Sequence, residues 1–331
     1  MNGKKPRIGV VIIGINVEKY LPDCIQSVQS AAYPQDRIEI VYVDGGSRDN
    51  SLDAAWDFEG VRVVELKDRH PTPGRGRNAG WKLLNTPLIQ FLDADTILEP
   101  DWFQNALPEL NGSTAAVCGG RREKYPEKNN YHVLTNMEWN YEKGPCRYFG
   151  GDVLVGREVL EQTGGFDENL VAGEDPELSY RIRQTGRQIL RLNIPMTTHD
   201  INMSTPHQYL KRAYRSGYAY AEIGLRFISN KEKLWARELL RITARAVLPI
   251  FLILTGVVFG NILFGLLLGL LIAFKPLFSI GRIKRNFKQT WKYTILYGLH
   301  SSVVIFPQFF GILRYLGGCL ADRPLKNKGI V

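Results

Sequence analysis

The sequence predicts an α/β domain with a mostly parallel sheet, followed by a helical region that associates with a membrane. Between residues 7 and 120, short β-rich runs alternate with helical runs, which is the pattern of βαβ units. Further on, residues 246–274 contain no charged side chain, and a span of about 20 apolar residues suffices to cross a bilayer. We therefore expect a catalytic-type domain over 1–225 and an interfacial and transmembrane helical region over 226–331.

The βαβ pattern also assigns the individual elements. The expected strands are 7–15, 38–43, 61–66, 88–92 and 115–119, and the expected helices are 17–32, 49–58, 76–84 and 101–110. Ligands of such sheets bind beyond the carboxyl ends of the strands, where Asp44 and Asp93 fall. The first run has no small-residue cleavage site after it and is interrupted by Glu18-Lys19, so we interpret it as a strand and not as a signal peptide.

The formal charge of +9 is unevenly distributed along the 331 residues. Residues 231–331 hold 15 Lys or Arg against 3 Asp or Glu, and these basic residues flank apolar runs. Nucleic-acid binding needs basic residues clustered on a folded domain, so we expect no nucleic-acid partner. The four cysteines show no CxxC pair and no metal-like spacing, which indicates reduced thiols on the cytosolic side.

The C-terminal region leaves two topologies open. As one helix, the run 246–274 would be about 43 Å long, longer than a hydrocarbon core of about 30 Å; it could instead bend at Gly260-Asn261 into a hairpin. The loop 275–292 carries six basic and no acidic residues, and basic loops stay in the cytoplasm, so we predict that it faces the cytoplasm. A second uncharged run, 293–313, is a further membrane candidate, and the basic, aromatic helix 207–227 is either interfacial or an ordinary packed helix.

Acidic residues at strand ends predict the functional site. The stretch "IQFLDADT" ends in Asp93 and Asp95, and Mg²⁺ characteristically joins one or two carboxylates to substrate phosphates. The stretch "VYVDGGSRDNS" places Asp44 at another strand tip, where it could contact a base or ribose or simply serve a strand-to-helix turn. Further on, "GRGRNAG" brings Arg77 among glycines at a helix entry.

A third acidic stretch, "GEDPELSYR", opens a helix with Glu174 and Asp175. Acidic residues in a first helical turn are commonly dipole partners, but beside a diphosphate site one of them could deprotonate an acceptor hydroxyl. In their order, "VDGGSRD", "GRGRNAG", "FLDADT", "GGF" and "GEDPELSYR" resemble a family 2 glycosyltransferase with the nucleotide-diphospho-sugar-binding GT-A fold, over about residues 7–220. The chain is most similar to membrane-associated glucosyltransferases of bacterial exopolysaccharide (succinoglycan-type) assembly.

This resemblance implies roles for single residues on the donor side. Asp44 would contact the uracil or ribose and Arg77 would lie near the nucleotide. Asp93 would hold the ribose side and serve with Asp95 as a metal ligand, and Asp95 would bind Mg²⁺ or Mn²⁺ on the diphosphate. Many relatives carry an acidic residue where this chain has Gly45, so the usual base contact would shift to Asp44 or be absent.

The resemblance also implies the acceptor-side chemistry. Asp175 would be the base with Glu174 beside it, and Gly151 and Asp152 would shape the acceptor pocket. His199 in "TTHD" matches a region where some GT-A enzymes place a third metal ligand, although a lone histidine is more often structural.

The implied reaction is inverting transfer of one sugar from a nucleotide-diphospho-sugar, with a UDP-sugar expected, to a lipid-linked acceptor of the polyprenyl-diphosphate type. The expected location is the cell inner membrane, with the catalytic domain in the cytoplasm. No Gln-x-x-Arg-Trp sequence is present, which disfavours a processive polymerase. Two alternatives are a catalytically inactive membrane scaffold, disfavoured by the mutual repulsion of four carboxylates around one cleft, and a nucleotidyltransferase, which has no evident need for the "GEDPELSYR" segment.

Overall fold

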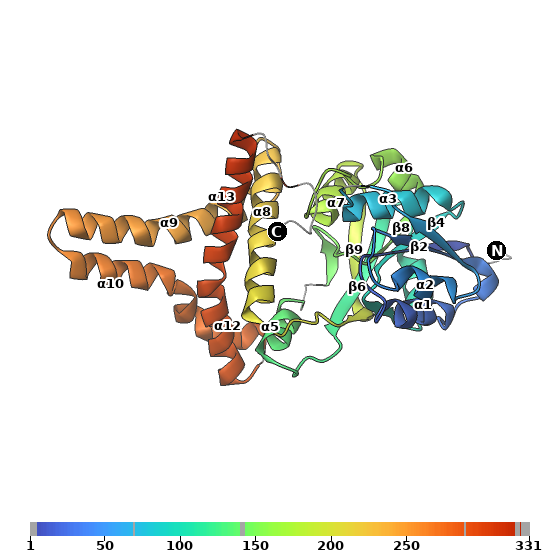
Figure 1. Ribbon diagram of the computed structural model, residues 1–331, viewed down its shortest axis with the longest axis horizontal. Coiled ribbons are helices and arrows are strands. Elements are labelled where there is room, and N and C mark those ends of the chain that lie inside the picture. Colours follow the sequence, from blue (N-terminus) through green and yellow to red (C-terminus); the bar gives the residue numbers. More distant parts are fainter. Residues whose placement is uncertain (1–4, 69, 140–142, 288, 322–324, 326–331) are drawn as a thin grey trace. The chain divides into compact units, whose positions relative to one another are not determined.

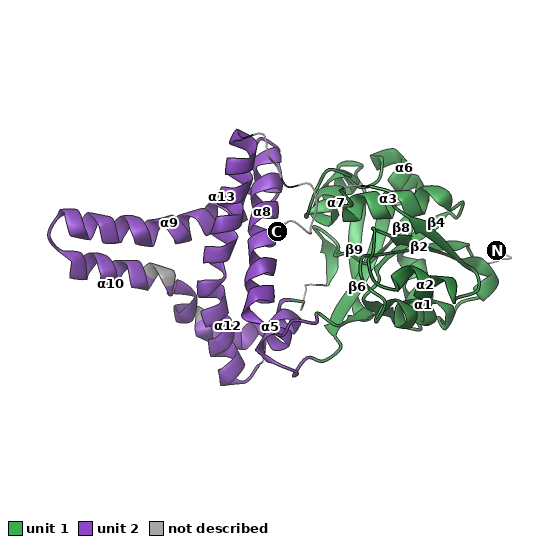
Figure 2. Cartoon of the chain, in the orientation of Figure 1, with its two compact units in different colours: residues 1–125, 139–201, 326–328 green, residues 126–138, 202–325, 329–331 purple. Residues whose placement is uncertain are grey.

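The computed structural model describes residues 5–68, 70–139, 143–287, 289–321 and 325. The chain forms two compact units (Figure 2). We call the first the sheet unit, with described residues in 5–125 and 139–201, and the second the helical unit, with 126–138 and 202–325. The compact units thus divide between Ile201 and Asn202, and the functional division at 225/226 remains a prediction.

The sheet unit is built on one mixed sheet. In spatial order its strands are β3 (Val61–Glu65), β2 (Ile38–Asp44), β1 (Ile8–Gly14), β4 (Leu88–Asp93), β8 (Val153–Gly156), β6 (Thr114–Glu123), β9 (Gln188–His199) and β5 (Thr96–Leu98), and β7 (Gly144–Cys146) pairs with β9. The first four strands are parallel, whereas β8 runs antiparallel to both β4 and β6. The five strands expected from the sequence are present, and the antiparallel β8 makes this a Rossmann-like mixed sheet, as the resemblance to the GT-A fold implied.

Helices cover both faces of this sheet, with α1 and α2 on one side and α3, α6 and α7 on the other (Figure 1). Their bounds are α1 (Leu21–Gln29), α2 (Ser51–Trp56), α3 (Pro73–Leu83), α4 (Trp102–Ala106), α6 (Arg157–Thr163) and α7 (Glu174–Gln184), with 3₁₀ turns at Gln35–Arg37 and Leu107–Glu109. The helix expected over 101–110 breaks into α4 and a 3₁₀ turn because Pro108 has no amide hydrogen to donate.

Burial on both faces explains why the central strand β1 is a continuous apolar run. Ile8, Val10, Val11 and Ile12 of β1 are fully buried, as expected of a parallel strand with helices on either side. The register pairs Gly14 with Asp44 of β2 and Ile13 with Asp93 of β4. The two strand-end carboxylates therefore flank the carboxyl end of β1.

The helical unit comprises α5 (Asn130–Glu138), α8 (Pro206–Arg226), α9 (Ala236–Val258), α10 (Ile262–Ala273), a 3₁₀ turn (Lys275–Ser279), α11 (Ile280–Phe287), α12 (Trp291–Val303) and α13 (Ile305–Leu320). A capping box formed by Thr205 and Gln208 starts α8. This helix packs closely along α13, because a Cβ at Gly217 or Gly311 would overlap the backbone of the other helix. Of the two interpretations of this helix, one face of α8 fits the ordinary packed helix, because it packs on α13.

The apolar C-terminal sequence is not one straight helix. It folds back at Gly260, whose φ is +67°, so that α9 and α10 form a hairpin. By length and composition, Ala236–Val258 and Trp291–Leu320 are two segments that could cross a membrane, among the described residues.

Candidate active site

A single buried arginine gathers the acidic residues of the site. Arg77 of α3 is 2% exposed and donates to Asp93 Oδ1 at 2.8 Å and to Glu174 Oε1 at 2.8 Å. Its guanidinium also lies 3.4 Å from Asp175 Oδ1. Burial disfavours the charged form of Arg77, but the carboxylates of Asp175, Asp93 and Glu174 outweigh burial and raise its pKa. The arginine is a permanent cation that holds two acidic motifs together.

Local sequence explains why Arg77 reaches this position. Thr72 caps α3, accepting a hydrogen bond from the Arg75 amide at 3.2 Å, and Pro73 follows in the first turn. Gly80 lets α3 lie against β1, because a Cβ there would overlap Val11. The glycines of "GRGRNAG" thus serve close packing, and the other arginine of the motif, Arg75, pairs with Asp68 at the surface.

A second buried ion pair, Arg121–Asp152, holds the end of β4 in place. Asp152 is fully buried, and its Oδ1 accepts a hydrogen bond from the Asp93 amide at 3.1 Å. Its Oδ2 accepts from Arg121 at 2.7 Å and from Thr197 at 2.7 Å. Asp152, predicted on the acceptor side, is therefore placed where it holds the backbone of Asp93, and its Oδ2 is already bound by two donors.

Gly151 sits directly against this network. A Cβ at Gly151 would overlap Asp93 Oδ2 and lie 3.1 Å from the Arg77 guanidinium. Arg121 approaches the same Asp93 Oδ2 at 3.6 Å, so both oxygens of Asp93 face a guanidinium. The absence of a side chain at Gly151 is what allows the carboxylate and the arginine to approach this loop.

Asp95 pairs with a histidine. Its Oδ2 is 2.9 Å from His199 Nε2, at the end of β9. His199 is 11% exposed, packs edge-on to Trp139, and its Nδ1 is buried without a hydrogen-bond partner among the described residues. Adjacent ligands of an octahedral ion at about 2.1 Å lie about 3 Å apart. The separation of Asp95 Oδ2 and His199 Nε2 is that of a direct hydrogen bond and is also compatible with two adjacent ligands of a divalent cation.

The acidic pair of α7 divides into a buried and a more accessible member. The helix starts after Gly173, which has a φ of +90° that favours glycine, and its first-turn carboxylates face the positive end of the helix dipole. The Glu174 side chain is 6% exposed and that of Asp175 is 18% exposed. Glu174 anchors Arg77, and Asp175 is the member that a substrate can reach more readily.

Asp44 is placed at the tip of β2 and is fully buried. Its Oδ1 accepts from the Tyr42 and Ser47 hydroxyls, and its Oδ2 accepts from the Gly46 and Ser47 amides, both at 2.8 Å. The carboxylate therefore fixes the turn after β2, the structural alternative that the sequence left open. Gly46 has a φ of +92°, which only glycine adopts readily.

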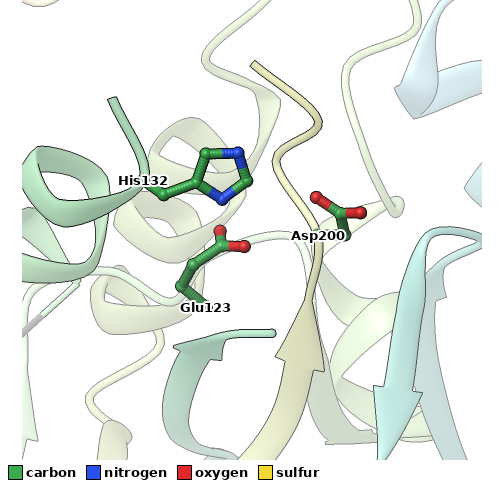
Figure 3. A group of neighbouring side chains, drawn as sticks. All are labelled: Glu123, His132 and Asp200. Atoms are coloured by element: carbon green, nitrogen blue, oxygen red, sulfur yellow. The ribbon is translucent and has the colours of Figure 1, made fainter. Parts of the chain in front are cut away.

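Two further carboxylates of the sheet unit stand at the ends of the paired strands β6 and β9. These are Glu123 and Asp200, drawn in Figure 3. Glu123 accepts hydrogen bonds from the amides of Tyr125 at 3.1 Å and Ile201 at 3.3 Å. The third labelled side chain, His132, belongs to the helical unit, so only the two carboxylates belong to the unit that carries the site described above.

Comparison with known proteins agrees with this architecture. Residues 9–166 match the family model described as glycosyl transferase family 2. This chain carries a family 2 glycosyltransferase domain. Its sheet and helices form the GT-A glycosyltransferase fold. The matched part of the domain contains Asp44, Arg77, Asp93 and Asp95, whereas α7 and the end of β9 lie beyond it.

Relatives of the family 2 domain include glycosyltransferase AglE of Haloferax volcanii, 24% identical over 67% of this chain and 76% of the relative. The putative glycosyltransferase EpsH of Bacillus subtilis is 24% identical over 69% of this chain and 71% of the relative. Among solved structures, the mannosyltransferase PcManGT from Pyrobaculum calidifontis, in complex with GDP-Man and Mn²⁺, has a TM-score of 0.65 at 18% identity, covering 90% of this chain and 87% of that one. At this identity the structural likeness concerns the fold.

Sequence reasoning missed two residues that complete the network of the family 2 domain. Arg121 and Thr197 both bind Asp152, and the carboxylates of Asp152 and Asp93 raise the pKa of Arg121 although its burial opposes this. The weak signal for Arg121 was its place at the end of an expected strand, 115–119. Nothing in the sequence marked Thr197, because its strand β9 was not predicted.

Proposed function

We propose that this glycosyltransferase transfers a single sugar from a nucleotide-diphospho-sugar to a lipid-linked acceptor, with inversion at the anomeric carbon. A UDP-sugar is the expected donor and a polyprenyl-diphosphate-linked glycan the expected acceptor. The observation that carries the proposal is the convergence of Asp93, Glu174 and Asp175 on Arg77. Through Arg77, the strand-end motif of Asp93 is joined to the motif that begins α7, although Arg77 and Glu174 are 97 residues apart in the sequence. Asp95 follows Asp93 by two residues, so the diphosphate and the acceptor would meet here.

Asp95 and His199 are the residues that would hold a divalent cation, Mg²⁺ or Mn²⁺. Their 2.9 Å separation and the hard oxygen and imidazole nitrogen ligands fit such an ion. When bound, the cation supplies positive charge that offsets the negative charge of the leaving diphosphate. The Mn²⁺ and GDP-Man bound by PcManGT are consistent with this assignment. Asp93, held by two arginines, is assigned to the ribose side of the donor.

Asp175 is assigned as the general base. Its carboxylate would accept the proton of the acceptor hydroxyl while that oxygen forms the bond to the anomeric carbon, and the bond to the diphosphate oxygen breaks. The neighbouring cation Arg77, 3.4 Å from Asp175 Oδ1, fixes the position of this carboxylate. Asp44 is assigned to the uracil or ribose site, which it would shape by fixing the turn after β2.

The acceptor side of the proposal rests on the helical unit. Its apolar runs 246–274 and 293–313 carry no charge and are flanked by basic residues, which suits an enzyme that works on a lipid-linked substrate at an anionic membrane surface. We assign the protein to the cell inner membrane, with its catalytic domain in the cytoplasm, in the assembly of a polysaccharide or related glycan.

Release of nucleoside diphosphate from a panel of nucleotide sugars tests the proposal. Purified protein would be incubated with Mn²⁺, Mg²⁺ or EDTA, with and without a lipid-linked acceptor, and transfer of labelled sugar to the lipid would be scored in parallel. We expect Asp95→Ala to abolish metal-stimulated release and Asp57→Ala, which alters an exposed carboxylate, to retain it.

Three outcomes would contradict parts of the proposal. Undiminished turnover of a folded Asp95→Ala variant removes the metal role. Formation of nucleoside triphosphate and sugar 1-phosphate when pyrophosphate is added, in place of nucleoside diphosphate release, indicates a nucleotidyltransferase. If no combination of donor and acceptor gives sugar transfer, although the protein still binds nucleotide sugars, the protein is the inactive scaffold.

A further inference from the structure

The helical unit contains an apolar hairpin whose turn forms hydrogen bonds within itself. The helices α9 and α10 are joined at Gly260. The amide of Asn261 donates to the Gly256 carbonyl at 2.7 Å, and Asn261 Oδ1 accepts from the Phe264 amide at 3.3 Å. The amide and the side-chain oxygen of Asn261 are thereby paired within the turn, which favours placing the turn in hydrocarbon.

Small residues hold the two arms of the hairpin together. A Cβ at Gly265 would lie 2.5 Å from the Leu252 carbonyl oxygen, and one at Gly256 would lie 3.0 Å from the Gly265 Cα. A Cβ at Gly269 would meet the Pro249 carbonyl oxygen at 3.2 Å. Close backbone approach through glycine is the packing mode of helices surrounded by lipid, where the hydrophobic effect does not drive helix association.

The outer surface of the hairpin is apolar on all sides. Residues 246–274 carry no charge, and Phe259 and Leu263 at the tip are 82% and 76% exposed. The other exposed apolar side chains of the arms are Val247, Leu248, Ile250, Phe251, Leu254, Val257, Val258, Ile262, Phe264, Leu266, Leu267, Leu270, Leu271 and Phe274. Soluble monomers rarely expose apolar patches of more than a few hundred Å², so this surface needs a cover.

The length of the hairpin decides how deep it reaches. The uncharged part of α9, 246–258, and α10, 262–273, are each about 20 Å long at about 1.5 Å per residue. The hydrocarbon core of a bilayer is about 30 Å thick. A hairpin of this length enters the core without emerging on the far side.

Basic residues stand at both open ends of the hairpin. Arg241 and Arg245 precede the uncharged part of α9, and Lys275 follows α10. The next helix, α11, adds Arg282, Lys284 and Arg285. Since both ends leave the hairpin on the same side, these cations gather at one face, where they complement anionic lipid headgroups.

The second apolar segment has a different relation to the membrane. Its helices α12 and α13 are separated at Val304, and α13 packs along α8, which carries Lys211, Arg212 and Arg215. Because charged side chains are costly in hydrocarbon, a helix pair that includes these three cations favours a position at the membrane surface. The exposed large apolar residues of α13 form one stripe, at Phe306, Phe310, Leu313, Leu316 and Leu320. Figure 1 shows α9 and α10 projecting away from the α8–α13 pair.

We propose that the α9–α10 hairpin inserts into a lipid bilayer from one side and returns to that side, that the α8–α13 pair lies along the same surface, and that neither apolar segment crosses the membrane. The bilayer is the partner that covers the hairpin. This assignment is independent of the glycosyl-transfer reaction, because it rests on the helical unit and its test does not measure enzymatic activity.

A fluorescent label on a single cysteine measures the depth of the tip. The background is the full chain with Cys146→Ser and Cys319→Ser; the other two cysteines are buried. One label is placed at Phe259→Cys in the tip, and its matched control is at Gly281→Cys on α11, an exposed position where a Cβ meets nothing within 4 Å. The protein is bound to the outside of phosphatidylcholine vesicles containing phosphatidylglycerol. Quenching by brominated lipids reports depth, and quenching by iodide reports contact with water.

We expect the Phe259→Cys label to be quenched by bromines deep in the acyl chains and shielded from iodide on either side of the vesicle. The Gly281→Cys label should be quenched by external iodide. Quenching of the tip label by iodide trapped inside the vesicle would show a full crossing and would overturn the proposal. A tip label already shielded before vesicles are added, in a protein that self-associates in solution, would show that a second copy covers the hairpin.

A charge in the tip gives a second readout. We expect Leu263→Lys to lower the vesicle partition coefficient by about 100-fold, because a lysine in the hydrocarbon is strongly disfavoured. Leu83→Lys, the same substitution at an exposed leucine of α3 in the sheet unit, should leave it unchanged. Equal partitioning of the two folded variants would overturn insertion.

Discussion

Removal of the Arg77 guanidinium should destabilise the sheet unit more than any change at the surface of the same helix. Arg77→Gln leaves the carboxylates of Asp93, Glu174 and Asp175 facing one another without their cation. Breaking a buried ion pair by removing one partner costs about 3–5 kcal/mol. For a unit of this size, about 2–4 °C of melting temperature are lost per kcal/mol, so the midpoint should fall by roughly 6–20 °C.

The matched control lies two residues away. Arg75→Gln removes an arginine whose pair with Asp68 is about a third exposed on both sides, 32% and 30%. Such a pair contributes about 0–1 kcal/mol. Thermal unfolding followed by circular dichroism would compare the two variants with the unaltered chain at one pH and ionic strength.

A second substitution tests the physical reason for the effect. In the Arg77→Gln background, Glu174→Gln removes one of the repelling carboxylates and should raise the midpoint, whereas in the unaltered chain it removes a partner of Arg77 and should lower it. If Arg77→Gln melts within about 2 °C of Arg75→Gln, or if Glu174→Gln has the same sign in both backgrounds, the guanidinium does not hold the carboxylates together.

Further substitutions test the loop, the base and the turn. Gly151→Ala should reduce turnover by about tenfold or more, because its Cβ would displace the carboxylate beside it, while Gly150→Ala, where a Cβ meets nothing within 4 Å, should not; equal rates would contradict the tight approach. Asp175→Asn should lower the transfer rate by about 10²–10⁴-fold and leave nucleotide affinity intact in a UDP titration; a parallel loss of affinity would reassign the residue to donor binding. Gly46→Ala should cost about 1–2 kcal/mol in urea unfolding, owing to its positive φ, whereas Gly112→Ala, with open space around it, should cost less than half of that.

The sequence alone determined the parallel half of the sheet and the apolar composition of the C-terminal region. The β-rich runs before Asp44 and Asp93 are local signals, since a strand buried on both faces needs a continuous apolar stretch, and all five expected strands are present. The uncharged run 246–274 likewise indicates lipid contact by composition, and Gly260-Asn261 marks the turn because glycine adopts positive φ readily.

Only the tertiary structure decided how the acidic motifs meet. Arg77 and Glu174 are 97 residues apart, and no local pattern states that a helix-entry arginine will be buried between carboxylates. His199 reaches Asp95 because β9 pairs antiparallel with β5, placing Thr96 opposite His199. Such pairings depend on long-range strand register, which a single sequence does not encode locally. The same reason explains why Asp152, Arg121 and Thr197 emerged as the support of Asp93 only once β6, β8 and β9 lay side by side.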